Sequence, residues 1–82
     1  MSFQWTTMNK MSNMEDEVRM VSLHGFIAVF WERVRADRSR GGNLTYQQIY
    51  SGMEADYEGR YGVTRFPSYD AFRKARERYK TP

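Results

Sequence analysis

The sequence predicts a small all-α domain of three helices, in which the last two form a helix-turn-helix-like pair. Apolar residues recur at helical spacing in three segments, residues that favour helix N-caps precede these segments, and glycine- or proline-containing stretches separate them. We expect helices at about 14–37, 45–58 and 68–80, in a single helical domain spanning 14–82 behind a flexible N-terminal tail, 1–13. A chain of 82 residues has room for one small core.

The first predicted helix carries apolar residues on two sides. One broad face holds Met20, Leu23, Ile27, Phe30, Trp31 and Val34, while Val18, Val21, Ala28 and Val29 lie nearly opposite. Such a helix needs two coverings, which the other helices, the N-terminal tail or a second subunit would provide. Val18, Val21 and Val29 are therefore the candidate partner interface. Gly25 is costly in a helix interior and marks either close backbone approach or a local break.

The second predicted helix begins with a capping box. Thr45 as N-cap places Gln48 at the third helical position. The core stripe that follows comprises Tyr46, Ile49, Tyr50, Met53 and Tyr57, while Gln47, Glu54 and Glu58 face away. Gly59 and Gly62 are expected to end the helix, and a short hairpin in 59–67 is the alternative for the segment that follows.

The last predicted helix combines a cap with many charges. Ser68 follows Pro67 as the N-cap, and Ala71, Phe72, Ala75 and Tyr79 point inward. Asp70 with Lys74, and Arg73 with Glu77, are spaced four apart and could form ordinary surface pairs. A DNA-reading helix, however, needs only three or four side chains at base edges near its N-terminus, with other cations on phosphates.

Two segments resemble helix-turn-helix proteins, especially small regulators and transposition-type DNA-binding domains of phages and other mobile elements. They are Leu44-Thr45-Tyr46-Gln47-Gln48-Ile49, at the start of the supporting helix, and Pro67-Ser68-Tyr69 followed by Phe72-Arg73, at the start of the reader. The resemblance covers residues 44–80. It departs from the family in the connection from Gly59 to Pro67, which is about twice the usual 3–4-residue turn.

On the DNA interpretation, the contacting residues come from the last helix, from the connection before it and from the basic loop after the first helix. They are Ser68, Tyr69, Asp70, Arg73, Lys74, Arg76, Arg65, Arg38 and Arg40. The chain has 13 Lys and Arg against 10 Asp and Glu, a net charge of +3, and a pI near 9.4. This balance permits binding to a polyanion without requiring it.

Composition argues against several other classes of protein. There is no cysteine and only one histidine, His24, which argues against a metal centre, against a cofactor and against general-base catalysis. The longest apolar run, Phe26 to Trp31, is too short to span a membrane. We therefore expect a cytoplasmic, non-enzymatic protein.

Two functions remain open at this stage. One is a small regulator, transcriptional or in mobile-element control, that binds double-stranded DNA, with a homodimer through the first helix left open. The other is a phage-type interaction module that binds or inhibits a host protein through exposed valines and a Tyr- and Arg-rich surface, since these two residue types are enriched at binding hot spots.

Overall fold

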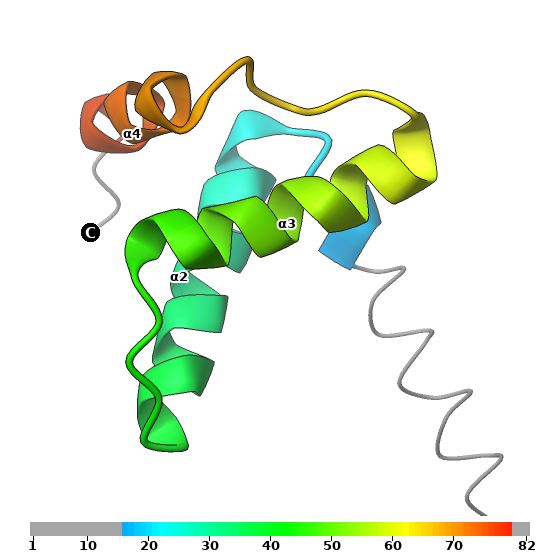
Figure 1. Ribbon diagram of the computed structural model, residues 1–82. Coiled ribbons are helices and arrows are strands. Elements are labelled where there is room, and N and C mark those ends of the chain that lie inside the picture. The colour runs from blue at the N-terminus through cyan, green and yellow to red at the C-terminus, as the bar shows by residue number, and fades with distance from the viewer. Residues whose placement is uncertain (1–15, 80–82) are drawn as a thin grey trace, which may run out of the picture.

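The computed structural model describes residues 16–79, and all regular secondary structure in this range is helical. A helical turn at 16–19 precedes α2 (Leu23–Ser39), α3 (Tyr46–Tyr61) and α4 (Tyr69–Arg78). α3 crosses α2, and the chain then runs back so that α4 lies beyond the first turns of α3 (Figure 1). The predicted all-α class is confirmed. The predicted tail, 1–13, lies outside the described residues. The alternative hairpin at 59–67 does not form, because 59–61 belong to α3 and 62–67 contain no strand.

The predicted first helix, 14–37, is interrupted at residues 20–22. Ser22 has extended backbone and caps α2, its hydroxyl oxygen accepting a hydrogen bond from the Gly25 amide at 3.0 Å. A Cβ atom at Gly25 would lie 1.8 Å from the carbonyl oxygen of Arg19. Of the two alternatives for Gly25, close backbone approach is observed at the residue itself, and it accompanies the break at 20–22, where the chain turns sharply before α2.

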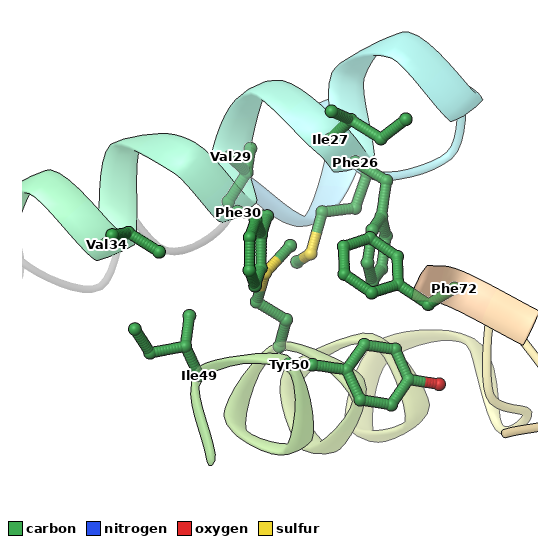
Figure 2. Packing of buried hydrophobic residues seen from close by; sticks show 10 residues of the cluster. Phe26, Ile27, Val29, Phe30, Val34, Ile49, Tyr50 and Phe72 are labelled. Atoms are coloured by element: carbon green, nitrogen blue, oxygen red, sulfur yellow. The ribbon is translucent and has the colours of Figure 1, made fainter. Parts of the chain in front are cut away.

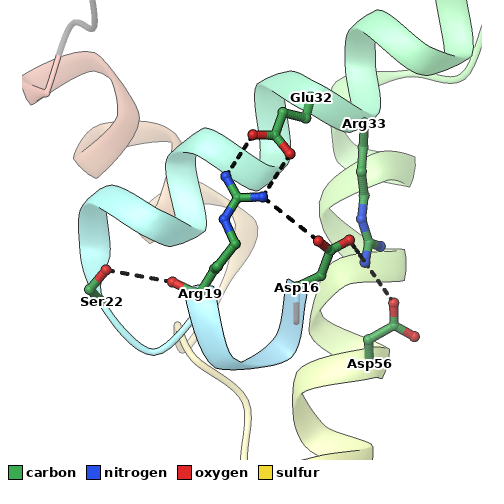
Figure 3. A network of polar contacts seen from close by, with 6 residues as sticks. All are labelled: Asp16, Arg19, Ser22, Glu32, Arg33 and Asp56. Carbon is green, nitrogen blue, oxygen red and sulfur yellow. Dashed lines mark hydrogen bonds and ion pairs between the residues drawn. The ribbon is translucent and has the colours of Figure 1, made fainter. Parts of the chain in front are cut away.

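The turn lays residues 16–19 beside α2. The Arg19 guanidinium donates to both carboxylate oxygens of Glu32, at 2.9 and 2.6 Å, and Asp16 lies 3.7 Å from Arg33 (Figure 3). Glu32 and Arg33 follow Val29 by three and four residues, so they share its side of the helix. Val29 is fully buried, and the prediction that it belongs to an exposed partner interface is wrong.

An aromatic cluster joins the three helices. Phe26, Phe30 and Phe72 are fully buried, and the Phe72 ring centroid lies 5.4, 4.9 and 5.0 Å from those of Phe26, Phe30 and Tyr50 (Figure 2). Contacts of this kind each contribute about 0.5–1.5 kcal/mol beyond the burial of area. Phe72 is the buried residue of α4, so this ring anchors the helix to the rest of the core.

The predicted capping box of α3 is confirmed. Thr45 Oγ1 accepts from the Gln48 amide at 3.1 Å, and Gln48 Oε1 accepts from the Thr45 amide at 2.8 Å. The helix continues past Gly59 and ends at Gly62, which has a left-handed φ of 80° and donates its amide proton to the carbonyl of Glu58. Of the two predicted stop signals, only Gly62 acts as one.

Glu54 departs from the prediction that it faces solvent. It is 7% exposed, and its carboxylate accepts hydrogen bonds from the Tyr50 hydroxyl and from the backbone amides of Arg65 and Phe66, the latter two at 2.7 and 2.9 Å. Burial and the Glu54 carboxylate raise the pKa of the Tyr50 phenol, which therefore keeps its proton and donates it. These bonds fix the connection between α3 and α4.

Candidate nucleic-acid interface

The cap and inner side of α4 determine which residues the helix presents to solvent. Ser68 caps the helix as predicted, its hydroxyl oxygen accepting from the Ala71 amide at 3.2 Å. The Tyr69 ring is half-buried, 5.5 Å from that of Tyr50. At 100° per residue the side opposite Phe72 is formed by five charged residues, which we call the α4 face: Asp70, Arg73, Lys74, Glu77 and Arg78.

The charges of the α4 face are paired along the helix. Arg73 donates to Asp70 at 2.8 Å and to Glu77 at 3.0 Å, and the ammonium of Lys74 lies 3.3 Å from Asp70. The surface pairs predicted from spacing are confirmed. Hydrogen bonds from Arg73 and then Lys74 lower the pKa of the Asp70 carboxyl, and the pKa of Arg73 is raised, chiefly by Asp70. Asp70 and Arg73 therefore stay charged at neutral pH.

Arg76 lies on the inner side of α4 rather than on the α4 face. Its guanidinium carbon is 5.2–5.9 Å from the ring centroids of Phe30, Trp31, Tyr46 and Phe72. One guanidinium nitrogen, Nη1, is buried and has no hydrogen-bond partner among the described residues. Arg76 thus holds α4 to α2 and α3 through cation–π contacts. The predicted role of Arg76 in contacting DNA is corrected to a role in packing.

Arg65 is likewise occupied within the fold. Its Nε donates to the carbonyl of Val21 at 3.2 Å, and its guanidinium carbon lies 5.0 Å from the Phe66 ring centroid. The side chain joins the connection before α4 to the turn before α2. We therefore leave Arg65 out of the candidate interface, although the sequence placed it there.

Arg38 and Arg40 lie at the end of α2 that is remote from α4 (Figure 1). Both are near the carboxylate of Asp37, which is 3% exposed, Arg38 at 2.5 Å and Arg40 at 3.9 Å. Asp37 also accepts from the Leu44 amide at 3.1 Å. The structure therefore does not bring the predicted phosphate contacts of this loop together with the α4 face.

A second exposed surface, the valine patch, lies where the turn before α2 meets the end of α3. Val18, Val21 and Val63 are 58%, 51% and 61% exposed, and Tyr61 is 38% exposed. The two segments lie side by side, because the Tyr61 hydroxyl donates to the carbonyl of Glu17 at 3.2 Å. Val18 and Val21 were predicted to be interface residues. Tyr61 and Val63 were missed because they come from a different segment.

Neither a metal-binding cluster nor a membrane-spanning helix is present among the described residues. Residues 16–79 contain no group of three or more His, Cys, Asp and Glu side chains placed to hold a metal ion. None of the helices in this range is long and apolar enough to cross a membrane.

No protein-family model, curated protein or solved structure matches the chain. The functional interpretation therefore depends on the geometry of two surfaces, the α4 face and the valine patch.

Proposed function

We propose that the protein is a small regulator, in transcriptional or mobile-element control, that binds double-stranded DNA with α4 as its reading helix. The observation that carries this proposal is the two-sidedness of α4. Phe72 and Arg76 fix its inner side to the aromatic core, while Arg73, Lys74 and Arg78 stand on the outer side. A reading helix needs such rigid support and a few long polar side chains directed away from it.

The ion pairs of the α4 face do not prevent DNA binding. Side chains of the paired residues are 39% exposed at Arg73, 70% at Lys74 and 59% at Asp70. Exposed pairs of this type contribute only about 0.2–1 kcal/mol each, whereas a bidentate arginine–guanine contact discriminates by about 1–3 kcal/mol. The cations can therefore exchange a carboxylate for DNA at small cost.

The proposal gives the exposed cations different roles. Arg73, near the middle of the helix and held at both ends of its guanidinium, is assigned to a base edge. Lys74 and Arg78 are assigned to phosphates of the DNA backbone. The ammonium of Lys74 acts as a point charge, and the guanidinium of Arg78 stands at the end of the helix, and both suit phosphate contacts. Ser68 and Tyr69 flank this surface, with the Ser68 hydroxyl already used as a cap.

The proposal is tested by fluorescence anisotropy with a labelled random-sequence duplex over a salt series. Two phosphate contacts, from Lys74 and Arg78, would give a slope of log affinity against log salt of about −2. Lys74→Ala is expected to reduce this slope by about 1 and to weaken all sequences alike. Arg73→Ala is expected to cost about 1–3 kcal/mol at a preferred site and to relax discrimination there.

Arg38→Ala locates the DNA path in the same assay. We expect little change, because Arg38 lies at the other end of α2 and is paired with Asp37. A loss equal to that of Lys74→Ala would show that the basic loop belongs to the DNA path. Absence of binding by the wild-type protein at low salt would refute the proposed function.

The valine patch favours a second candidate function, a phage-type module that binds or inhibits a host protein. Three exposed valines and a tyrosine from two adjoining segments form an apolar surface without a covering element among residues 16–79. Self-association through the same residues would give the homodimer considered from the sequence.

A further inference from the structure

Asp70 is the N-terminal residue of the α4 face. It lies in the first turn of the helix and is bonded to both Arg73, at 2.8 Å, and Lys74, at 3.3 Å. Its side chain is 59% exposed, so it does not serve the packing of α4. A carboxylate at this position also repels phosphate from the end of a helix where the backbone amides and the dipole would otherwise attract it.

We propose that Asp70 is a specificity-determining residue of the reading helix, an inference that rests on the proposed function. Asp70 restrains two of the three exposed cations of α4, and it opposes contacts with phosphate at the N-terminal turn. It also orients Arg73 before DNA binds: with Nη2 bonded to Asp70 and Nη1 bonded to Glu77, the guanidinium is held in one orientation across the face until a base replaces a carboxylate.

The two effects act on different parts of DNA binding. Affinity for random sequence comes almost entirely from phosphate contacts, and each additional contact steepens the dependence on salt. Affinity for a preferred site also includes base contacts, which depend on the orientation of the reading side chain. Asp70 therefore lowers the affinity for random DNA more than the affinity for the preferred site, and the ratio between the two rises.

The experiment compares wild type with Asp70→Asn, using a random duplex and a preferred duplex selected from a random pool with the wild-type protein. Asp70→Asn is expected to bind random DNA about 3–10-fold more tightly at 0.1 M salt, with a slope steeper by about 1 as Arg73 also engages a phosphate. The ratio of the Kd for random DNA to the Kd for the preferred site should fall about 2–5-fold, because the preferred site gains less than random DNA.

Two variants serve as matched controls. Glu58→Gln makes the same change in net charge at an exposed position near the end of α3, and it should change the affinity for random DNA less than twofold. Glu77→Gln frees only one bond of Arg73, and we expect it to give a smaller gain than Asp70→Asn. An equal gain from Glu58→Gln would overturn the inference, because net charge alone would then explain the result.

The failure of this inference is distinguishable from the failure of the proposed function. If wild type binds DNA through Lys74 but Asp70→Asn leaves random affinity and discrimination unchanged, the role of Asp70 is overturned while DNA binding stands. If neither wild type nor Asp70→Asn binds any duplex at low salt, both are overturned. Circular dichroism and thermal melting of each variant show that the compared proteins are folded.

Discussion

At the scale of single residues, the two buried carboxylates, Glu54 and Asp37, show a limit of prediction from sequence. Glu54 was predicted from spacing to face solvent, and no pattern predicted the burial of Asp37, yet they are 7% and 3% exposed. Their partners include backbone amides from loops, those of Arg65 and Phe66 for Glu54 and that of Leu44 for Asp37. Helical periodicity contains no information about which loop amide will meet a given carboxylate.

Arg76 is a different case, because the sequence did contain a signal. Arg76 follows Phe72 by four residues and therefore lies on the same inner side of α4. Its position relative to the aromatic residues was a better guide than its charge. The structure accordingly retains Arg73 and Lys74 on the exposed surface and assigns Arg76 to the core.

Replacing Glu54 by glutamine tests its role in fixing the connection before α4. The amide group keeps one acceptor oxygen but leaves at least one of the amides of Arg65 and Phe66 without a partner. We expect a loss of about 1–3 kcal/mol in the free energy of unfolding, measured by urea denaturation. Hydrogen exchange at these two amides should accelerate.

Glu58→Gln, on the same helix but exposed, is the matched control for this change and should alter stability by less than about 0.5 kcal/mol. Equal effects of the two substitutions would show that the buried bonds of Glu54 contribute nothing specific to stability.

At the scale of elements, prediction succeeded where the determinants were local. Thr45 and Ser68 each cap a helix through an amide three residues away, and both caps form as expected. The interruption at 20–22 could not be located in this way, because apolar spacing continues through it. Only Gly25 indicated it, and the sequence left open whether this residue marked a close approach or a break.

Gly25→Ala tests the turn before α2. The added Cβ would lie 1.8 Å from the carbonyl oxygen of Arg19 and 2.8 Å from Ser22 Oγ, so the backbone of the turn must shift. We expect a loss of about 2–3 kcal/mol in urea denaturation. Gly52→Ala is the control, since nothing lies within 4 Å of a Cβ there. That variant should gain about 0.5–1 kcal/mol, and a loss of stability at Gly52 as large as that at Gly25 would contradict the steric argument.

At the scale of the whole molecule, the two candidate surfaces are separated along α3. The α4 face lies near the start of α3, whereas the valine patch adjoins its last residues (Figure 1). A helix of this length extends about 24 Å. Val18 and Val21 stay at the surface, whereas Val29 of the same predicted helix is buried in the core. Helical periodicity alone does not predict this difference, because it depends on how the turn before α2 folds.

This separation predicts that the two functions can be removed independently. A variant with both Val18→Glu and Val21→Glu should fold normally, because these side chains are 58% and 51% exposed. Its affinity for DNA should stay within about threefold of the wild-type value, because the two added negative charges act only over a Debye length. If the valine patch binds a host protein, a complex recovered from nuclease-treated lysate should be lost with this variant. The same double substitution should abolish any homodimer seen by light scattering.

Leu44→Glu provides the control for this experiment, because it introduces an acid at an apolar residue of similar exposure, 40%, in the loop between α2 and α3. It should leave both the complex and the homodimer intact, since it lies outside the valine patch. Retention of the complex by the double valine variant would exclude the valine patch as the protein interface. Loss of DNA binding by a folded double variant would instead show that the two surfaces act together. Electrostatic repulsion between the two added carboxylates and the DNA is screened over the separation of the two surfaces and could not by itself cause this loss.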